Sequence, residues 1–339
     1  MSSPKIAVLG AGANGASIGA DLTAAGVDVT LIEQWPAHVE AMRESGLTID
    51  MPDTTLHVAP RTMHLCEVAT LREPFDVVLL LVKAYDTRWA SELIKPYLAE
   101  DGILAGVQNG MTTDVIADVV GSERTMGTVI EISSTMYDPG RVTRHVAPER
   151  SWFAVGSIDS AAEGRRSDIA TLLGHSGTVA IVDNIRATKW MKLISNTTVL
   201  VPTAAVGLPM AEALEYPGMR DVMVAAGREA RDVGAALGHP LLPIFGLSAD
   251  DVSRPETVVD TLLEVLYKGF VVPGATTTVL QDWTKHRHSE VDDINGTVVA
   301  EGARVGVPTP INAAVVDVAH RIERGELQPG LANLELLLG

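Results

Sequence analysis

The feature that most constrains how this chain folds is a glycine-rich segment near its amino terminus. The residues KIAVL, Lys5 to Leu9, are typical of a strand and run directly into GAGANG, Gly10 to Gly15, where a helical pattern begins. Gly10 permits a tight turn, Gly12 lets the backbone approach a pyrophosphate, and Gly15 lets the helix pack closely on the strand. An ordinary glycine turn is the alternative, but the complete strand–turn–helix context favours dinucleotide binding. The residues expected at the dinucleotide are Gly10, Gly12, Ala13, Asn14 and Gly15.

The end of the next strand indicates which dinucleotide binds. The run VDVTLI, Val27 to Ile32, is followed by Glu33, close to the ~20-residue spacing at which an acidic residue meets the adenosine ribose. A carboxylate accepts hydrogen bonds from the ribose hydroxyls and repels a 2′-phosphate, so Glu33 predicts NAD rather than NADP. The alternative is a solvated charge, because the helical pattern WPAHVEAM begins just beyond it.

The pattern of apolar runs divides the chain into two parts. In the first, short β-branched runs alternate with helical patterns, which predicts a parallel sheet with helices on both faces. The runs TMGTVIEI, RVTRHV, WFAVG and TVAIVD lie closer together and are expected to complete this sheet with partly antiparallel strands. From Arg186 onward long helical patterns dominate. We therefore predict an α/β fold, with a Rossmann-type dinucleotide-binding domain at residues 1–184, an all-α substrate and dimerisation domain at residues 185–339, and the substrate in the cleft between them.

Composition and charge limit the classes of function. The chain has 26 basic and 43 acidic side chains and a formal charge of −17, which disfavours binding to nucleic acid or to anionic membranes. The most apolar run, VVLLLV at Val77 to Val82, is too short to span a bilayer. A single cysteine, Cys66, and the lack of a charged leader before the first apolar run predict a cytoplasmic protein. No metal site is expected.

The stretch KWMKLISN, Lys189 to Asn196, places an ammonium among apolar residues. Trp190 and Leu193 fit the buried stripe of a helix, yet Lys192 and Asn196 stand four residues apart on one face. One explanation is a lysine whose stem packs on the core while its head reaches water. After a nucleotide domain, such a lysine can instead protonate a carbonyl oxygen while hydride arrives from a nicotinamide. We favour the second explanation.

Five motifs together resemble the ketopantoate reductase (2-dehydropantoate 2-reductase) family over nearly the whole chain. They are GAGANG, LLVKAYDT at Leu80 to Thr87, VQNGM at Val107 to Met111, KWMKLISN, and TTTVLQDWTKHRHSEVDDING at Thr276 to Gly296. The β-hydroxyacid dehydrogenases also carry a lysine and an asparagine four residues apart, but with glycines just before the lysine. Residues 185–191 contain no glycine, so that family is set aside.

The resemblance implies a role for each matching residue. Lys192 matches the general acid of the family, which acts as the base in the reverse reaction. Asn196 matches an amide that helps to orient the substrate, and Asn109 matches a catalytic residue beside the nicotinamide and the substrate. Thr278 falls where the family has a serine that binds the substrate carboxylate, and a threonine keeps that hydroxyl. Glu290 matches an acidic residue that binds a substrate hydroxyl or supports the lysine, although SEVDD alone is typical of solvated charges.

Departures from the family pattern bear on the cofactor and the substrate. Members that use NADP carry an arginine at the end of the second strand, where this chain has Glu33 and Gln34. Lys83 matches a cofactor-contacting lysine that lies near the 2′-phosphate in those members. By this match Lys83 is counted among the expected cofactor-binding residues, as are Glu33 and Asn109. The alternatives for Lys83 are a pair with Glu33 and a plain strand-end charge. Two amides of the family pattern are replaced by Leu200 and Ala275, which predicts a more apolar substrate pocket than ketopantoate needs.

These observations predict a nicotinamide-dependent oxidoreductase that transfers hydride reversibly between NAD(H) and a 2-oxo acid/2-hydroxy acid pair. The acid is expected to be 2-dehydropantoate-like or a more apolar branched or aromatic acid. Three alternatives stay open: an NADPH-dependent 2-dehydropantoate 2-reductase proper, an opine- or imine-type dehydrogenase, and a non-catalytic nucleotide-sensing module. Retention of Lys192, Asn109 and Glu290 argues against the last. Related folds dimerise through the helical domain, so a homodimer is also an open alternative.

Overall fold

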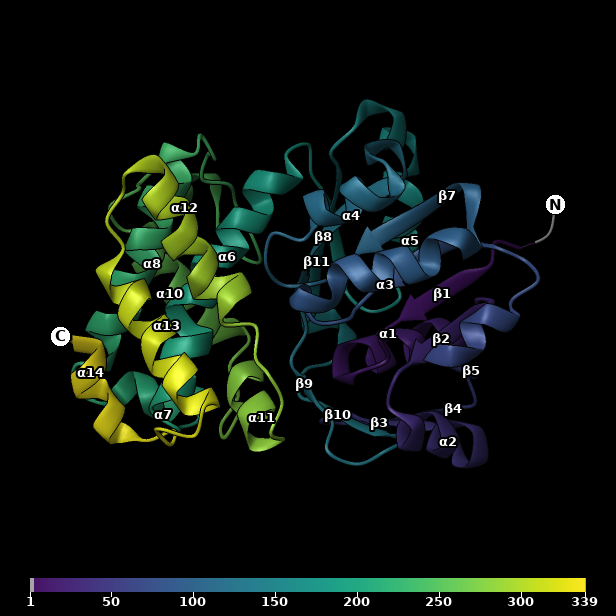
Figure 1. Ribbon diagram of the computed structural model, residues 1–339, viewed down its shortest axis with the longest axis horizontal. Helices are drawn as coiled ribbons and strands as arrows, with labels where there is room; N and C mark the ends of the chain where they lie inside the picture. The colour runs from purple at the N-terminus through teal and green to yellow at the C-terminus, as the bar shows by residue number, and fades with distance from the viewer. Residues whose placement is uncertain (1–2, 339) are drawn as a thin grey trace. The chain divides into compact units, whose positions relative to one another are not determined.

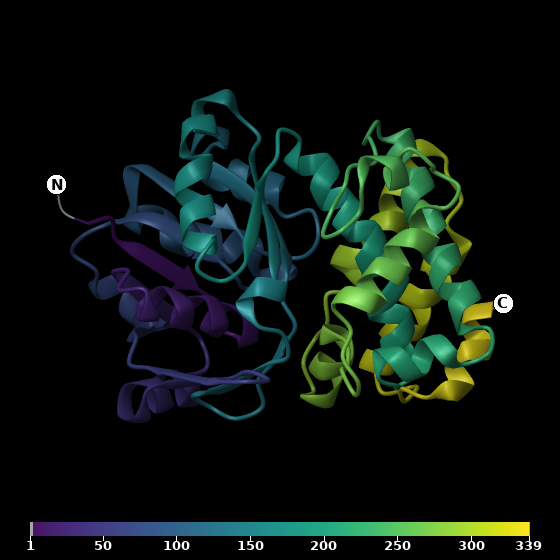
Figure 2. The ribbon, with the colours of Figure 1, turned by 180° about the vertical axis from the view of Figure 1, so that it is seen from behind.

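The computed structural model describes residues 3–338, which form two compact units. The sheet unit comprises the described residues up to Gln108 together with Thr112–Arg186. The helical unit comprises Asn109–Met111 and the described residues from Ala187 onward. Figure 1 and Figure 2 show the elements of each unit from opposite sides, and the architecture confirms the predicted α/β class.

The sheet unit is built on an eight-stranded sheet in the order β12-β11-β8-β7-β6-β1-β2-β5. All neighbouring strands pair in parallel except β8 and β11, which are antiparallel, as expected for strands that complete a parallel sheet. The strands are β1 (Ile6–Leu9), β2 (Val29–Glu33), β5 (Arg61–His64), β6 (Phe75–Leu80), β7 (Leu98–Gly106), β8 (Thr125–Glu131), β11 (Trp152–Ser157) and β12 (Thr178–Ile181).

Helices cover both faces of this sheet, because its central strands are apolar on both sides. In β1, Ile6 and Val8 belong to one apolar cluster, whereas Ala7 and Leu9 belong to another. The first cluster includes residues of α1 (Ala13–Ala24) and α5 (Arg166–Leu173), and the second includes residues of α3 (Thr87–Ile94) and α4 (Thr113–Val120). A further helix, α2 (Pro36–Ser45), follows β2. Burial on both faces explains the continuous apolar runs of the parallel strands.

One predicted strand does not join the main sheet. The run RVTRHV forms β10 (Arg141–Arg144), which pairs with β3 (Leu47–Asp50) in a second sheet of order β4-β3-β10-β9. The other strands of this sheet are β4 (Thr55–Val58) and β9 (Ser134–Thr135). Arg144 is fully buried, and its Nη1 donates to Asp21 Oδ2 of α1 at 2.7 Å. This ion pair ties β10 to α1. Because β10 lies between β3 and β9 in the second sheet, the expectation that RVTRHV completes the main sheet is wrong.

The helical unit is organised around α6 (Ile185–Ala205), most of whose residues are buried. The described residues from 187 onward form no strand, in agreement with the predicted all-α second part. The other helices are α7 (Met210–Glu215), α8 (Met219–Ala236), α9 (Ala249–Val252), α10 (Val258–Gly269), α11 (Thr278–Thr284), a π-helical turn (Asp292–Gly296), α12 (Thr297–Val305), α13 (Pro310–Glu323) and α14 (Leu334–Leu338).

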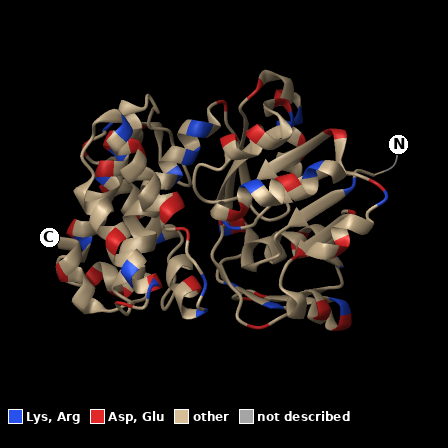
Figure 3. Ribbon diagram, viewed as in Figure 1, with Lys and Arg blue, Asp and Glu red and all other residues tan. Residues whose placement is uncertain are grey.

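Charged side chains lie on the elements of both units. Figure 3 shows acidic and basic residues interspersed along the helices of each, so the charge of −17 is not confined to one unit. Within residues 3–338, no helix combines the length and the apolar character that crossing a bilayer requires.

Candidate dinucleotide site and catalytic residues

The glycine-rich turn between β1 and α1 has the backbone geometry that its sequence predicts. Gly10 has a φ of +97°, and a Cβ there would lie 2.7 Å from the backbone nitrogen of Val82. A Cβ on Gly15 would lie 2.0 Å from the carbonyl oxygen of Gly10, so only glycine permits this close packing of helix on strand. Around Gly12 there is open space, and Gly12 is also the N-cap of α1. The helix therefore begins with uncapped N–H groups, which fit a phosphate.

Two side chains hold this turn in place, and sequence reasoning missed both contacts. The side-chain oxygen Oδ1 of Asn14 accepts a hydrogen bond of 2.5 Å from the hydroxyl of Ser134 in β9. His38 of α2 is fully buried, with Nε2 3.1 Å from the carbonyl oxygen of Ala11, while Nδ1 accepts from the backbone N–H of Gly140 at 2.8 Å. These partners require the neutral ring with the proton on Nε2. Burial accordingly lowers the pKa of His38.

Glu33 is the last residue of β2 and is buried, with an exposed fraction of 7%. The alternative of a solvated charge is therefore wrong. Its Oε1 accepts a hydrogen bond of 2.8 Å from the backbone N–H of Trp35, so the carboxylate also orders the chain that leaves the strand.

Lys83 lies just beyond β6, next to Val82, whose backbone nitrogen lies beside Gly10. The side-chain amide of Gln108 donates to the carbonyl oxygens of Val82 and Lys83, at 2.8 and 3.3 Å, and so fixes the course of this segment. The backbone of Lys83 is thus fixed in the segment that follows β6, beside the glycine-rich turn.

One face of α6 carries the candidate catalytic residues. Lys192 and Asn196 are one turn apart, and Leu200 follows one turn later on the same face. Lys192 has an exposed fraction of only 9%, and its Nζ lies over the ring of Phe245, 5.0 Å from the centroid. A lysine that reaches into water along an apolar surface leaves its head solvated, which does not describe this contact.

The structure brings two of the predicted amides together. Asn196 Nδ2 donates to Asn109 Oδ1 at 3.1 Å, although 87 residues separate them in the chain. Asn109 follows β7 and precedes Gly110, whose φ of +71° turns the chain. The motifs VQNGM and KWMKLISN therefore meet at a single pair of amides.

Glu290 faces a lysine that sequence reasoning missed. Lys189 lies one turn before Lys192 on α6 and has an exposed fraction of 3%, and Glu290 has one of 4%. Burial lowers the pKa of Lys189 to about 7, against an opposing attraction from the charge of Glu290. The alternative that Glu290 is a solvated charge is therefore wrong. The three-residue spacing of Lys189 and Lys192 was the available signal for a shared face.

Neighbouring contacts fix the segment that carries Glu290. Glu323 Oε1 of α13 accepts hydrogen bonds from the backbone N–H and the hydroxyl of Ser289, at 3.0 and 2.6 Å. Asn295 Nδ2 donates to the carbonyl oxygen of Thr197 in α6 at 3.2 Å. The motif E-x-D-x-I-N-G is therefore tied on one side to α13 and on the other to α6, directly after Asn196.

Thr278 is the first residue of α11, next to its N-cap, Thr277, whose hydroxyl accepts from the backbone N–H of Leu280 at 3.2 Å. The hydroxyl of Thr278 is buried and has no hydrogen-bond partner among residues 3–338. Such a group costs about 1–3 kcal/mol unless a partner is supplied, which suits a hydroxyl that binds a ligand.

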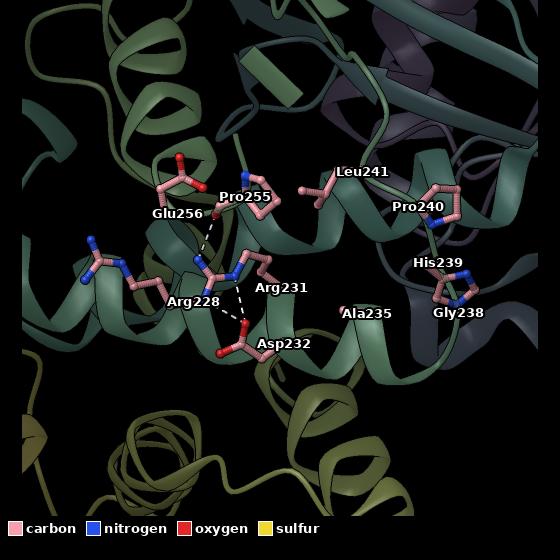
Figure 4. A pocket seen from close by; sticks show the side chains of 10 residues that line it. All are labelled: Arg228, Arg231, Asp232, Ala235, Gly238, His239, Pro240, Leu241, Pro255 and Glu256. Carbon is pink, nitrogen blue, oxygen red and sulfur yellow. Dashed lines mark hydrogen bonds and ion pairs between the residues drawn. The ribbon is translucent and has the colours of Figure 1, made fainter. Parts of the chain in front are cut away.

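A surface pocket of about 920 Å³ lies elsewhere in the helical unit. Figure 4 shows Arg231 directed at Asp232 and at the carbonyl of Pro255, so this guanidinium is already engaged within the pocket wall. None of the candidate site residues lines it. Its lining residues are Arg228, Arg231, Asp232, Ala235, Gly238, His239, Pro240, Leu241, Pro255 and Glu256. In the described part of the chain, no three His, Cys, Asp or Glu side chains are grouped to hold a metal ion.

Both parts of the chain match models of one protein family. Residues 6–158 match the model described as "Ketopantoate reductase PanE/ApbA", and residues 184–323 match the model described as its C-terminal domain. Among curated relatives, the 2-dehydropantoate 2-reductase of Archaeoglobus fulgidus is 26% identical over 328 residues, covering 95% of this chain and 98% of the relative. The enzyme of the same name from Caulobacter vibrioides is 29% identical, covering 92% and 96%.

Solved structures share the fold over 95% of this chain. A family ketopantoate reductase from Ralstonia eutropha superposes with a TM-score of 0.79 at 25% identity, covering 95% of this chain and 99% of that one. A D-mandelate dehydrogenase with NADH and anilino(oxo)acetate gives a TM-score of 0.83 at 23% identity, with the same coverage. Matches in both halves, together with the glycine-rich turn and the residues assembled on α6, show that the chain belongs to the ketopantoate reductase family of NAD(P)-dependent oxidoreductases.

Proposed function

We propose that this protein catalyses reversible reduction of an apolar 2-oxo acid to the 2-hydroxy acid, with NAD(H) as the redox partner. The observation that carries the proposal is the placement of Lys192 and Asn196 on one face of α6. Asn196 Nδ2 also donates a hydrogen bond of 3.1 Å to Asn109 Oδ1. In this proposal, residues 1–184 bind the dinucleotide and residues 185–339 hold the substrate. A homodimer formed through the second region is part of the same proposal, and sedimentation measures it directly.

In this proposal Lys192 transfers the proton to and from the substrate oxygen. When bound, the nicotinamide supplies or accepts the hydride. During reduction the Lys192 ammonium gives one proton to the carbonyl oxygen, and during oxidation the neutral amine takes the hydroxyl proton back, a contribution of about 10²–10⁴-fold for a positioned acid or base. The amides of Asn196 and Asn109 orient the carbonyl, and the partnerless Thr278 hydroxyl donates to the substrate carboxylate.

Two observations support the assignment of NAD. Glu33 ends β2 as a buried carboxylate, which accepts hydrogen bonds from ribose hydroxyls and disfavours a 2′-phosphate at the same place. The same fold carries NADH in the D-mandelate dehydrogenase structure, so the fold does not demand NADPH. NADPH-dependent reduction of 2-dehydropantoate is the second candidate. The curated relatives are named 2-dehydropantoate 2-reductase, and Lys83, which is next to Val82 at the glycine-rich turn, is a cation that suits a 2′-phosphate.

The substrate assignment rests on two apolar residues. Leu200 is half-buried one turn beyond Asn196, and Ala275 is buried three residues before Thr278. Neither can hydrogen-bond a terminal hydroxyl on the substrate through its side chain. An apolar surface instead favours a branched or aromatic tail by about 0.8 kcal/mol for each methylene that it buries.

The test is a steady-state screen of 2-oxo acids and 2-hydroxy acids with both cofactors. We expect turnover of branched and aromatic 2-oxo acids with NADH and weaker turnover with NADPH. An amine co-substrate belongs in the screen, because turnover that depends on it identifies an imine-forming reaction instead. Binding of NADH without turnover of any acid contradicts the proposal and favours a sensing role.

A further inference from the structure

We propose that Phe245 is a specificity-determining residue, whose ring forms the apolar wall beside Lys192 and selects 2-oxo acids with a branched or aromatic group next to the carbonyl. This inference rests on the proposed function and names the part of the chain that sets the substrate class. Sequence reasoning did not single out Phe245, which lies between α8 and α9, far along the chain from Lys192.

The backbone at Phe245 is held in a conformation that few side chains adopt. Its φ is +23°, and Gly246 follows with a φ of +108°. The turn is closed by a hydrogen bond of 2.9 Å from the N–H of Leu247 to the carbonyl oxygen of Ile244, and both side chains are buried. A positive φ at a bulky residue persists only where the surrounding structure enforces it, and such positions gather at sites that clamp ligands.

Contacts on its two sides fix the direction of the Phe245 ring. Phe270 meets it edge to face, with centroids 5.5 Å apart and planes at 77°, a favoured arrangement of aromatic pairs. The ammonium of Lys192 lies over the ring, 5.0 Å from its centroid, where the negative π face attracts a cation. The ring has an exposed fraction of 3% and is therefore held in one orientation, with its face toward the proposed proton donor.

The loop that carries Phe245 has a second contact with α6. His239, near the start of this loop, stacks on Trp190 with centroids 5.2 Å apart and planes at 26°. Trp190 is itself fixed, because its Nε1 donates to the carbonyl oxygen of Ala230 at 2.9 Å. The loop thus contacts α6 at Trp190 and again at Lys192, which explains how it can hold a ring against the lysine.

The position of the ring relative to Lys192 decides which substituent it meets. In this proposal the carbonyl oxygen accepts from Nζ at about 2.9 Å, and the carbon chain of the substrate extends from that carbonyl toward the ring. The π face repels a carboxylate and packs well against apolar or aromatic groups. The carboxylate is therefore directed away from Phe245, toward a donor such as the Thr278 hydroxyl, and the side chain of the substrate packs on the ring.

The test compares kcat/KM with NADH for pyruvate, 2-ketoisovalerate and phenylglyoxylate in the unmutated protein and its variants. We expect Phe245→Ala to lower kcat/KM by about 10- to 100-fold for the branched and aromatic acids and by less than about 3-fold for pyruvate. If the alanine variant fails to fold, Phe245→Leu, which keeps an apolar side chain, tests the ratio of kcat/KM for phenylglyoxylate to that for pyruvate. It should lower the preference for phenylglyoxylate over pyruvate by about 3- to 10-fold. Tyr216→Leu, at an exposed aromatic side chain of the same unit, is the control and should leave the preferences for 2-ketoisovalerate and for phenylglyoxylate over pyruvate within about 3-fold of the unmutated values.

Two results overturn the inference, and they are distinguishable from each other. An equal loss of kcat/KM for all three acids in folded Phe245 variants means that the ring only positions Lys192 and does not select substrates. If the unmutated protein turns over none of the 2-oxo acids, the proposed function fails, and the inference fails with it. Thermal melting of each variant shows whether it is folded.

Discussion

Asn196 of α6 donates a hydrogen bond of 3.1 Å to the side-chain oxygen of Asn109, which follows the β7 strand 87 residues earlier. The contact joins two motifs that the sequence offers separately, and Asn196 itself lies one helical turn from Lys192. In the proposed reaction, this pair orients the carbonyl that Lys192 protonates.

Replacing Lys192 by methionine should lower turnover by about 10²–10⁴-fold, because the thioether cannot transfer a proton. Affinity for NADH should stay near that of the unmutated protein, since the ammonium acts on the substrate. Steady-state kinetics and a fluorescence titration with NADH measure the two effects. Lys268→Met removes an exposed lysine of the same unit and serves as the control. Normal turnover in Lys192→Met would leave the lysine a packing role only.

The double change Glu33→Ser and Gln34→Arg should narrow or invert the preference for NADH over NADPH. It removes a buried carboxylate that disfavours the 2′-phosphate and adds a guanidinium that pairs with it. The ratio of kcat/KM for the two cofactors is the measurement, with the exposed Glu44→Ser as the control. A preference for NADPH in the unmutated protein contradicts the role of Glu33 and points to Lys83.

Lys189 should make stability rise with pH above neutrality. Burial lowers its pKa to about 7 in the folded protein, whereas an unfolded lysine titrates near ~10.4. Between these values the unfolded chain binds more protons, so the free energy of unfolding rises by up to ~1.4 kcal/mol per pH unit. Nearby Asp293, whose pKa burial and the charge of Glu290 raise to about 6, is already ionised in this window.

Urea unfolding at several pH values tests this linkage. In Lys189→Met the rise between pH 7 and about pH 10 should disappear, while the exposed-lysine variant Lys268→Met should keep it. Parallel curves for the unmutated protein and Lys189→Met would show that Lys189 stays charged beside Glu290.

Protonation of His38 should weaken the support of the glycine-rich turn at low pH. Burial lowers its pKa, so the stability that the neutral ring contributes is present above its ordinary value of ~6.5 and is lost as pH falls through the folded pKa. Protonation of Nδ1 breaks the bond that it accepts from Gly140. Affinity for NADH should therefore fall between pH 8 and about pH 5.5, with melting temperature following the same course.

His38→Leu separates this coupling from general acid effects. Loss of both hydrogen bonds should weaken NADH binding at pH 8 by up to about 5- to 150-fold, since each bond contributes roughly 0.5–1.5 kcal/mol and 1.4 kcal/mol is a factor of ten. The variant should also flatten the pH dependence of NADH binding. His57→Gln, at an exposed histidine of the same unit, is the control. An unchanged pH profile in His38→Leu would assign the acid sensitivity to another group.

Replacement of the family amides by Leu200 and Ala275 should remove discrimination for the terminal hydroxyl of ketopantoate. We expect 2-ketoisovalerate, which lacks that hydroxyl, to be turned over with NADH at least as efficiently as ketopantoate. The ratio of kcat/KM for the two acids decides this. A preference for ketopantoate of about 10⁴-fold or more is the scale of a buried site that reads a hydroxyl, and it would restore the plain family function.

Features that depend on neighbours along the chain could be predicted from the sequence. The turn at Gly10 to Gly15 follows from a strand, three glycines and a helix within one short segment, because the positive φ of Gly10 and the close approach of Gly15 are local requirements. The alternation of apolar runs in the first part, and its replacement by helical patterns after Arg186, likewise separated the sheet from the helices. The motifs also pointed to Lys192, Asn196 and Asn109 as residues of one site.

Features that depend on which distant segments pack together were decided only by the tertiary structure. The pattern RVTRHV is strand-like in any sheet. Only the tertiary structure places it beside β3 and buries Arg144 against Asp21. A lysine in a helical stripe has the same local pattern whether it is solvated or buried. Only the tertiary structure distinguishes the two cases, by burying Lys189 near the charge of Glu290 and by placing the Phe245 ring under Lys192. Desolvation and ring contacts come from neighbours in space, and a linear pattern does not contain them.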